Sequence, residues 1–369
     1  MLKTSELRRI LGVHFNWHKS RLDCFLQILI GLFIVRTVNL REIALAIESN
    51  AKIESCYRRL KAFFTKFKIN RIQIARWIFH LFVSKDGKKL YLSIDRTNWY
   101  FGKKKINVFA LSIAHEGVAI PIHWMLLNKA GNSTAQEQIQ LIEWFTKKFG
   151  IECIEGLLAD REFANKKLFS WLIKQKIPFY IRIKDNTHIR LFKQSKHSNL
   201  RKLFRGVHNK KRNYYPYSIF IWGLRLNVAA GRSESGELLV VVTNADAKNA
   251  VPIYLRRWEI ECLFQCLKGR GFRFEETHIT DQKKLSTLIC ILAVGVAWSI
   301  KVGEWRARRE PIRLNQHYDS LRPQYSYFRY GLDYIRETLI NNKDQVKKLR
   351  KSLVPIEFEP IKIGINLAW

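Results

Sequence analysis

Hydrophobic positions in the first 85 residues recur at spacings of three and four, the period of an amphipathic α-helix. The spacing is clearest at Leu22, Phe25, Leu26, Leu29 and Phe33. No proline occurs in this block, and only Gly12 and Gly31 interrupt it. The pattern therefore predicts a helical domain over residues 1–85.

Short segments rich in branched and aromatic residues replace this spacing from residue 90 onward. KLYLSID, INVFALSIAH and VAIPIHWMLL each predict a strand, and a helix is expected over 133–149. IECIEGLLAD predicts a fourth strand, ANKKLFSWLIKQK a second helix and IPFYIRIK a fifth strand. The order β-β-β-α-β-α-β resembles the ribonuclease-H-like layout, in which helices cover a mixed sheet. We therefore expect an α/β fold with a ribonuclease-H-like mixed-sheet core.

Two of these predicted strands end on a carboxylate. Asp95 closes the first strand and Asp160 closes the fourth. Either residue alone is as well explained by a helix cap or a turn. Two acids placed alike at two strand ends favour a shared functional site.

The segment 181–250 does not continue the predicted core. Between Arg182 and Arg212 the chain carries eleven Lys or Arg and one acid, Asp185. Strand-like pieces follow, YSIFIW, GLRLNVAAG and ELLVVVTNA, joined by turns that contain glycine. This pattern predicts a β-rich insertion with a strongly basic edge.

The stretch 251–271 reads as one amphipathic helix. At about 100° per residue, four polar side chains fall within about 60° of one another: Tyr254, Arg257, Glu261 and Lys268. An ordinary solvated face with Glu–Lys pairs would leave the tyrosine in this row unexplained. Glu259 points elsewhere on the same helix, so the pattern selects Glu261 as the third carboxylate.

The net charge of the chain indicates the class of partner that it binds. The chain has 369 residues, with 65 Lys and Arg against 31 Asp and Glu, a formal charge of +34. Such a balance is typical of proteins that bind a polyanion, with nucleic acid first and an anionic membrane surface second. A hydrophobic content of 47% excludes a disordered chain. Basic and aromatic residues interleave in the second half of the block 1–85, which favours DNA binding, although a solvated face of an ordinary bundle would look similar.

Membrane insertion is not expected. The two longest apolar runs, Leu26–Val35 and Leu288–Ile300, are shorter than the roughly 20 residues that cross a bilayer. Both predict buried core helices, and the first residues lack the pattern of a signal peptide. We expect a cytoplasmic protein associated with the nucleoid.

The six cysteines include no C-x-x-C pair. Cys262 and Cys266 lie four apart, but His278 stands alone near them, so a zinc site would be incomplete. Reduced structural thiols are the simplest interpretation.

Three carboxylates therefore remain as candidates for chemistry: Asp95, Asp160 and Glu261. Oxygen ligands without histidine suit Mg²⁺, with Mn²⁺ as substitute. Three acids can hold two such ions and so serve an in-line phosphoryl transfer. Arg257 and Lys268 would bind the flanking phosphates.

Three sequence motifs over Leu90–Gly271 carry a resemblance to a known family. The spacing Tyr254-x2-Arg257-x3-Glu261-x6-Lys268 is similar to the Y-R-E-K signature of the DDE transposases of bacterial insertion sequences. IDRTNW around Asp95 and LADREF around Asp160 resemble the family's two Asp motifs. The resemblance implies an Asp-Asp-Glu triad on a ribonuclease-H-like fold, a β-strand insertion before the Glu, and cut-and-paste transposition through a DNA hairpin.

The resemblance also implies roles for individual residues. Tyr254, Arg257 and Lys268 would contact DNA near the cleaved end. Arg161 and Glu162, which continue the D-R-E pattern, would support the site. Trp222, the insertion's only tryptophan, would stack on a flipped base, unless it belongs to the core of the insertion.

These inferences divide the chain into five parts: a helical DNA-binding domain (1–85), the first part of the core (86–180), the β-rich insertion (181–250), the Glu-bearing helix (251–282) and a helical C-terminal region (283–369). By resemblance, the last part would pair two subunits into a homodimer that joins two double-stranded transposon ends to target DNA. Two alternatives stay open: a ribonuclease-H-fold nuclease or resolvase without strand transfer, and a DNA-binding protein without catalysis.

Overall fold

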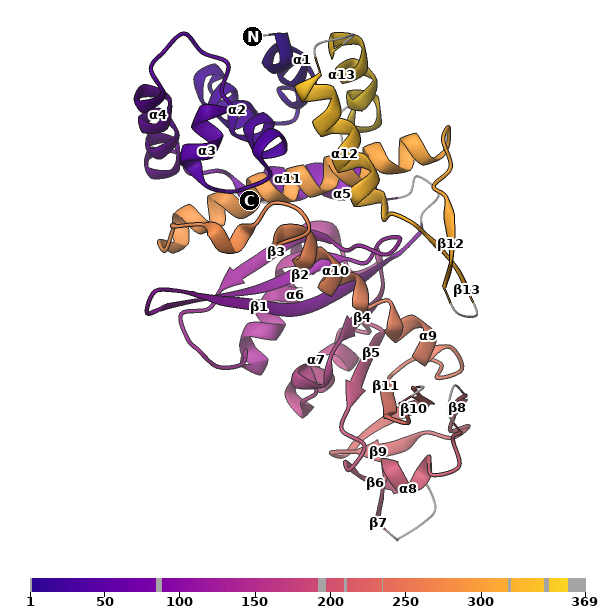
Figure 1. Ribbon diagram of the computed structural model, residues 1–369. Helices are drawn as coiled ribbons and strands as arrows, with labels where there is room; N and C mark the ends of the chain where they lie inside the picture. Colours follow the sequence, from indigo (N-terminus) through magenta and orange to yellow (C-terminus); the bar gives the residue numbers. More distant parts are fainter. Residues whose placement is uncertain are drawn as a thin grey trace. The chain divides into compact units, whose positions relative to one another are not determined.

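The computed structural model describes residues 2–83, 88–191, 197–208, 211–233, 235–317, 320–341 and 345–357. The chain forms two compact units, which are described separately (Figure 1). One unit comprises Val83–Cys262, and the other comprises Met1–Phe82 together with Leu263–Trp369. The five-part division expected from the sequence stays a prediction.

The unit Val83–Cys262 is built on a mixed sheet. Strands β1 (Leu90–Phe101), β2 (Lys104–Ile113) and β3 (Ile120–Leu126) form an antiparallel meander. Strand β4 (Ile154–Ala159) pairs parallel with β1, and β5 (Phe179–Ile183) pairs parallel with β4. Helix α6 (Ala135–Phe149) precedes β4, and the short η1 (Arg161–Phe163) and α7 (Lys166–Lys174) precede β5. The strand and helix order expected from the sequence is confirmed.

The insertion contains several further strands, but its relation to the core differs from the expectation. Strands β6 (His188–Leu191), β7 (His197–Asn199), β8 (Arg212–Tyr214), β9 (Ile219–Ile221), β10 (Leu224–Arg232) and β11 (Leu238–Thr243), with helix α8 (Leu200–Leu203), make up this region. Strand β11 pairs antiparallel with β5, so that Val241 lies opposite Arg182. The insertion is β-rich as predicted, yet it extends the core sheet, whose strands in the described residues run β3-β2-β1-β4-β5-β11-β10-β9-β6-β7.

The predicted helix over 251–271 is two helices. Helix α9 covers Ala250–Leu255 and α10 covers Trp258–Leu267. Between them the amides of Arg256 and Arg257 donate to carbonyls three residues earlier, at 3.1 and 2.8 Å. Such tight turns end the regular α-helical hydrogen bonding. The chain leaves α10 through Gly271, where a Cβ atom would lie 1.8 Å from the carbonyl oxygen of Cys266.

The other unit is mainly helical, and its N-terminal part confirms the helical prediction. Its elements are α1 (Leu2–Leu11), α2 (Lys19–Val35), α3 (Leu40–Leu45), α4 (Ile53–Lys66), α5 (Arg71–Phe82), η2 (Phe274–Glu276), α11 (Gln282–Ala307), α12 (Tyr327–Ile340), α13 (Gln345–Leu353) and η3 (Val354–Ile356). A two-stranded sheet of β12 (Leu314–His317) and β13 (Ser320–Pro323) interrupts the C-terminal region, which the sequence predicted to be helical. Local periodicity did not indicate this hairpin.

The two apolar runs are buried, as predicted. Leu26–Val35 lies in α2, and Leu288–Ile300 lies in α11. Helix α11 is longer than its apolar run. By length and composition alone it could cross a membrane, but 89% of its apolar window is buried inside the protein. Core packing accounts for its hydrophobicity.

Candidate active site

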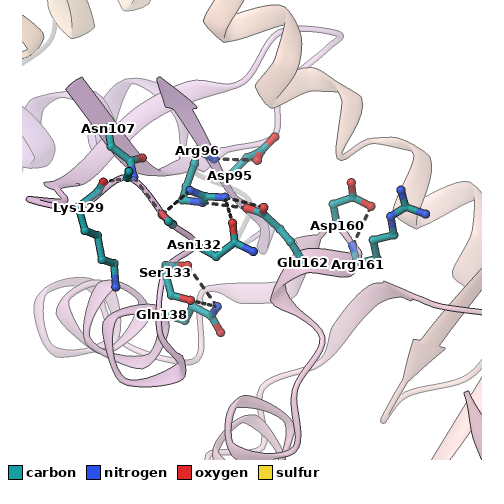
Figure 2. A network of polar contacts seen from close by, with 12 residues as sticks. Asp95, Arg96, Asn107, Lys129, Asn132, Ser133, Gln138, Asp160, Arg161 and Glu162 are labelled. Atoms are coloured by element: carbon teal, nitrogen blue, oxygen red, sulfur yellow. Dashed lines mark hydrogen bonds and ion pairs between the residues drawn. The ribbon is translucent and has the colours of Figure 1, made fainter. Parts of the chain in front are cut away.

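The sheet register places Asp95 and Asp160 at equivalent positions on neighbouring strands. The prediction that Asp95 closes its strand is wrong, because β1 continues past it to Phe101 by pairing with β2, whereas Asp160 directly follows the end of β4. Ile94 on β1 lies opposite Ala159 on the parallel strand β4. Asp95 and Asp160 each follow a paired residue, so they lie at the same edge on neighbouring strands (Figure 2). Each carboxylate accepts a hydrogen bond from the next backbone amide, at 2.7 Å from Arg96 and at 2.7 Å from Arg161. These bonds hold both side chains close to the chain.

Helix α9 holds Tyr254 over this edge. The apolar face of α9 packs on strands β4, β5, β10 and β11, and the Tyr254 side chain is buried in that contact. Its hydroxyl donates to Oδ1 of Asp160 at 3.2 Å. The same hydroxyl accepts a hydrogen bond from Nε of Arg257 at 3.2 Å. Tyr254 therefore connects Asp160 to the turn between α9 and α10.

Arg257 connects all three predicted carboxylates. Its Nη1 lies 2.6 Å from Oε1 of Glu261 and 3.8 Å from Oδ2 of Asp95. Through Tyr254 it also reaches Asp160. Only 12% of the Arg257 side chain is exposed, so its charge acts at short range with little screening. The structure thus brings together five of the predicted site residues.

Burial dominates the electrostatics of this cluster. It raises the pKa of Asp95 to about 7, although the Arg96 amide and the Arg257 guanidinium lower it and Glu162 and Glu261 raise it further. Burial also raises the pKa of Tyr254 to about 12. For Arg257 burial lowers the pKa, but Tyr254 and Glu261 outweigh it, and the net shift is upward. Arg257 therefore stays charged, whereas Asp95 accepts a proton near neutral pH.

The two glutamates of α10 face different partners in the structure, as the helical period predicted. Glu261 faces Arg257, and 34% of its side chain is exposed. Glu259 is buried and pairs with Nε of Arg256 at 3.3 Å. The Arg256 guanidinium in turn donates to the carbonyl of Ala114 at 3.1 Å. Burial raises the pKa of Glu259, whose Oε2 has no hydrogen-bond partner among the described residues.

Lys268 keeps its helical spacing from Glu261, because its amide donates to the carbonyl of Phe264 at 3.0 Å. The break between α9 and α10 separates both residues from Tyr254. Lys268 lies one residue past the end of α10 and forms an ion pair with Glu275 at 2.6 Å. It belongs to the unit that resumes at Leu263, whereas the other site residues belong to the sheet-containing unit. Its contact with DNA stays a prediction.

A second polar network lies beside the aspartates (Figure 2). Arg96 binds Glu162 with two hydrogen bonds, at 3.0 Å from Nε and 2.7 Å from Nη2. The same guanidinium donates to Oδ1 of Asn132 at 2.7 Å and to the carbonyl of Gly131 at 3.0 Å. The supporting role predicted for Glu162 therefore has a physical form: it holds the residue that follows Asp95.

Sequence reasoning missed Arg96, Asn132 and Trp258. The sequence did offer a signal for Arg96, because this residue directly follows Asp95 in IDRTNW. Nothing in the sequence near Asn132 marked Asn132 as the partner of Arg96. Trp258 begins α10 next to Arg257 and is 60% exposed. An exposed tryptophan beside a charged site is suited to stacking on a planar group.

Arg161 and Trp222 are placed differently: Arg161 adjoins Asp160 through its amide, whereas Trp222 lies in the insertion. Figure 2 shows the Arg161 side chain extending away from the Arg96–Glu162 pair. Trp222 occupies the turn between β9 and β10, is 38% exposed, and contacts the Phe169 ring at 5.5 Å between centroids. Its φ of 52° is unusual for an aromatic residue. It is therefore not part of the sheet core, and its stacking role stays a prediction.

The chemistry of the donor groups suits a divalent metal ion. The carboxylates of Asp95, Asp160 and Glu261 supply oxygen ligands, and the raised pKa of Asp95 shows that its ionised form lacks full compensation. Within the described part of the chain, however, no three Asp, Glu, His or Cys side chains lie close enough to form a ready-made metal site. The Arg257 guanidinium supplies the positive charge that Asp95 and Glu261 share.

Comparison with known proteins identifies the family. The sequence profile described as "Transposase DDE domain" matches residues 84–297, more than half of the chain. Among solved structures, the chain is similar to the one described as "Cryo-EM structure of piggyBac transposase synaptic complex with hairpin DNA", at 11% identity and a TM-score of 0.45. That alignment covers 98% of this chain and 83% of the other. No curated protein matches. By the match over residues 84–297, the chain belongs to the transposase DDE domain family.

Proposed function

We propose that this protein is a cut-and-paste transposase of the bacterial insertion-sequence group that carries the Y-R-E-K signature. It would bind the terminal inverted repeats of its element, cleave them and join them to target DNA. The single observation that carries the proposal is the convergence of Asp95, Asp160 and Glu261 through Tyr254 and Arg257. The strand order and the equivalent positions of Asp95 and Asp160 on neighbouring strands support a ribonuclease-H-like core.

Asp95, Asp160 and Glu261 would hold the metal, Mg²⁺ or Mn²⁺ and in our proposal two ions. When bound, such ions stabilise the charge on the attacking and leaving oxygens of a phosphoryl transfer. The family generally uses divalent metal ions, and the oxygen-only donor set agrees with that chemistry. The raised pKa of Asp95 means that metal and proton compete for this carboxylate.

The protein's own side chains would position the reaction. Tyr254 fixes the orientation of the Asp160 carboxylate through its hydroxyl. Arg257 neutralises the cluster before DNA arrives, and its bidentate guanidinium suits a phosphate next to the reacting one. Lys268 would hold a further phosphate, and Trp222 would stack on a flipped base. The exposed basic face of α4, which includes Arg58, Lys61 and Lys66, supports a DNA-binding role for the N-terminal helices.

Four phosphoryl transfers would follow one another at this one site. A water oxygen attacks the phosphorus at the transposon end and releases a 3′-OH. This 3′-oxygen then attacks the opposite strand, which forms a hairpin and frees the flanking DNA. A second water opens the hairpin, and the regenerated 3′-OH attacks target DNA. Each step makes one P–O bond and breaks one, so no oxidant or reductant is required. We propose that two subunits act together as a homodimer on paired ends, in the cytoplasm at the nucleoid.

The decisive experiment incubates the full-length protein with a labelled duplex that carries the terminal repeat of its element, in Mg²⁺ or in EDTA. A denaturing gel separates nicked strands from hairpins. A metal-dependent nick followed by a hairpin supports the proposal. Nicks without hairpins or strand transfer would indicate a nuclease or resolvase, and binding without cleavage would indicate a non-catalytic DNA-binding protein.

A further inference from the structure

We propose that a pocket next to Asp160 is a binding site for a DNA phosphate, and that Glu237 occupies this site until DNA binds. The pocket has a volume of about 220 Å³ and lies within the sheet-containing unit. Its charged lining residues are Arg161, Arg182, Lys184, Asp185 and Glu237. This inference rests on the proposed function, because it assigns the pocket to the same DNA.

Two of the cations in the pocket are available to a ligand. The side chains of Arg161 and Lys184 form no hydrogen bond or ion pair with any described residue. Asp185 is not available to neutralise them, because Arg201 binds it with two hydrogen bonds, at 2.8 and 3.2 Å. Arg201 does not line the pocket. A free anion would therefore find two positive charges there that no described residue pairs.

The third cation, Arg182, is paired with a carboxylate that can be replaced. Arg182 forms an ion pair with Glu237. The Arg182 side chain is 19% exposed and that of Glu237 is 63% exposed. An ion pair with so exposed a partner contributes little to stability, because solvent screens it. A phosphate offers more acceptor oxygens to the guanidinium fork and would displace the glutamate at little cost.

Hydrogen bonds hold the backbone at Glu237, so the displacement needs only a side-chain movement. Glu237 closes the turn between β10 and β11, where its amide donates to Oγ of Ser233 at 3.0 Å and its carbonyl accepts from the Ser233 amide at 3.0 Å. Nη1 of Arg232 donates to the carbonyl of Gly236 at 2.7 Å. The exposed carboxylate can rotate away while these bonds persist.

The pocket adjoins the carboxylate cluster by two routes. Arg161 directly follows Asp160 in the chain. Arg182 lies near enough to the Tyr254 hydroxyl for its positive charge to lower the pKa of Tyr254, against the larger rise that burial causes. Since Tyr254 donates to Asp160, an anion bound by Arg161, Arg182 and Lys184 would lie beside the reacting group. A phosphate that flanks the cleaved bond has this placement and this charge.

The test measures the affinity of the full-length protein for a short fluorescent duplex of random sequence, in EDTA, over a series of salt concentrations. Glu237→Gln removes the competing charge and keeps the shape, so affinity should rise about two- to fivefold. Lys184→Ala should weaken binding by a similar factor and reduce the slope of log K against log salt by about 0.9. Thermal unfolding checks that each variant is folded.

Matched controls come from an exposed ion pair on α6. Lys147 and Glu143 lie 3.2 Å apart, with 66% and 41% of their side chains exposed. Glu143→Gln and Lys147→Ala change the net charge by the same amounts as the two test variants. If each test variant behaves like its control, a general charge effect is at work and the phosphate site is refuted.

This test is separable from that of the proposed function. If the wild-type protein cleaves the terminal repeat but Glu237→Gln binds no more tightly than Glu143→Gln, the phosphate site alone is wrong. If Glu237→Gln binds more tightly than Glu143→Gln and Lys184→Ala has a smaller salt slope than Lys147→Ala, the site is supported even where the wild-type protein cleaves nothing. In that case the transposase proposal would fail and the site would serve another DNA reaction.

Discussion

Two groups of polar side chains lie where β1 and the end of β4 are neighbours, and they differ in how completely their charges are paired. The Arg96 guanidinium makes four hydrogen bonds of 2.7–3.0 Å, to Glu162, Asn132 and Gly131. Asp95, the residue before it, accepts one backbone bond and lies 3.8 Å from Arg257.

This difference separates positioning from reactivity. A guanidinium that makes four hydrogen bonds keeps its neighbours in one arrangement, because any other arrangement would break several of these bonds. A buried carboxylate with a distant counter-charge keeps a high free energy when ionised, and a metal ion would lower that free energy. The first group supports the site, and the second group is available to bind.

Removing a carboxylate of the second group should have the largest effect. Glu261→Ala is expected to reduce cleavage of the terminal repeat by about 10³-fold or more, because it removes a proposed metal ligand. DNA binding should persist, because the cations remain. A cleavage gel and a binding titration measure the two effects.

Glu259→Ala is the matched control for this variant, since it removes a carboxylate from the same helix. Glu259 pairs with Arg256 and not with Arg257. Cleavage by this variant should stay close to that of the wild-type protein. A strong loss in Glu259→Ala with activity retained in Glu261→Ala would contradict the assignment of the third acid.

Breaking the first group should have an intermediate effect. Arg96→Ala removes all four hydrogen bonds and leaves Glu162 without its partner. We expect cleavage to fall about 10- to 100-fold, as for residues that orient metal ligands. Arg96→Lys keeps the charge but not the bidentate geometry, so it should restore only part of the activity. Equal activity in Arg96→Lys and wild type would mean that charge alone matters here.

Neutralising Asp95 should trade activity for stability. Its pKa is raised from 3.8 to about 7 in the folded protein. The protonated carboxyl therefore contributes stability that is fully present below about pH 3.8 and is lost as the pH rises through about 7. Asp95→Asn resembles the protonated form and should be more stable than wild type by about 1–3 kcal/mol at a pH of about 8.

Thermal unfolding of both proteins at about pH 5 and about pH 8 measures this effect. The gain from Asp95→Asn should shrink at the lower pH, where the wild-type carboxyl is already protonated. A gain that does not depend on pH would show that burial of the charge is not its cause.

The smallest effect is expected at the edge of the first group. Asn132→Ala removes one of the four hydrogen bonds of Arg96. The free energy of unfolding should fall by about 0.5–1.5 kcal/mol, with little change in cleavage, since both bonds to Glu162 remain. Chemical denaturation measures the first quantity and the cleavage gel the second. A loss of activity as large as that of Arg96→Ala would mean that Asn132 contacts substrate.

The sequence predicted those features that depend on local periodicity. Hydrophobic runs marked β1 and β4, and the position of Asp160 at the end of β4 followed directly. The end of β1 was placed too early, because the polar text after Asp95 hid the continuation of the strand to Phe101. The helical period also distinguished Glu261 from Glu259, because their separation on the helix survives the break at Arg256 and Arg257. The break lies before both of them.

Features that depend on distant pairing could not be predicted in this way. The bond between Arg96 and Glu162 joins residues 66 positions apart. Strand β11, near the end of the insertion, pairs with β5, which precedes most of the insertion. The sequence does not show this distant pairing, so the insertion was predicted not to continue the core. The break at Arg256 and Arg257 within the stretch 251–271 was not predicted either, because the hydrophobic period runs through it. It lies before Glu261 and leaves the spacing from Glu261 to Lys268 intact, so the DNA contact of Lys268 stays a prediction.

The pairing of β5 with β11 has a consequence for protein engineering. The chain enters the insertion from β5 and leaves it through β11, and these strands are hydrogen-bonded to each other at Ile183 and Val240. A main-chain ladder at this junction leaves no flexible linker at which to cut. A chimera that exchanges the insertion should therefore carry both strands as one cassette. A shorter graft would leave an unpaired strand edge and invite aggregation.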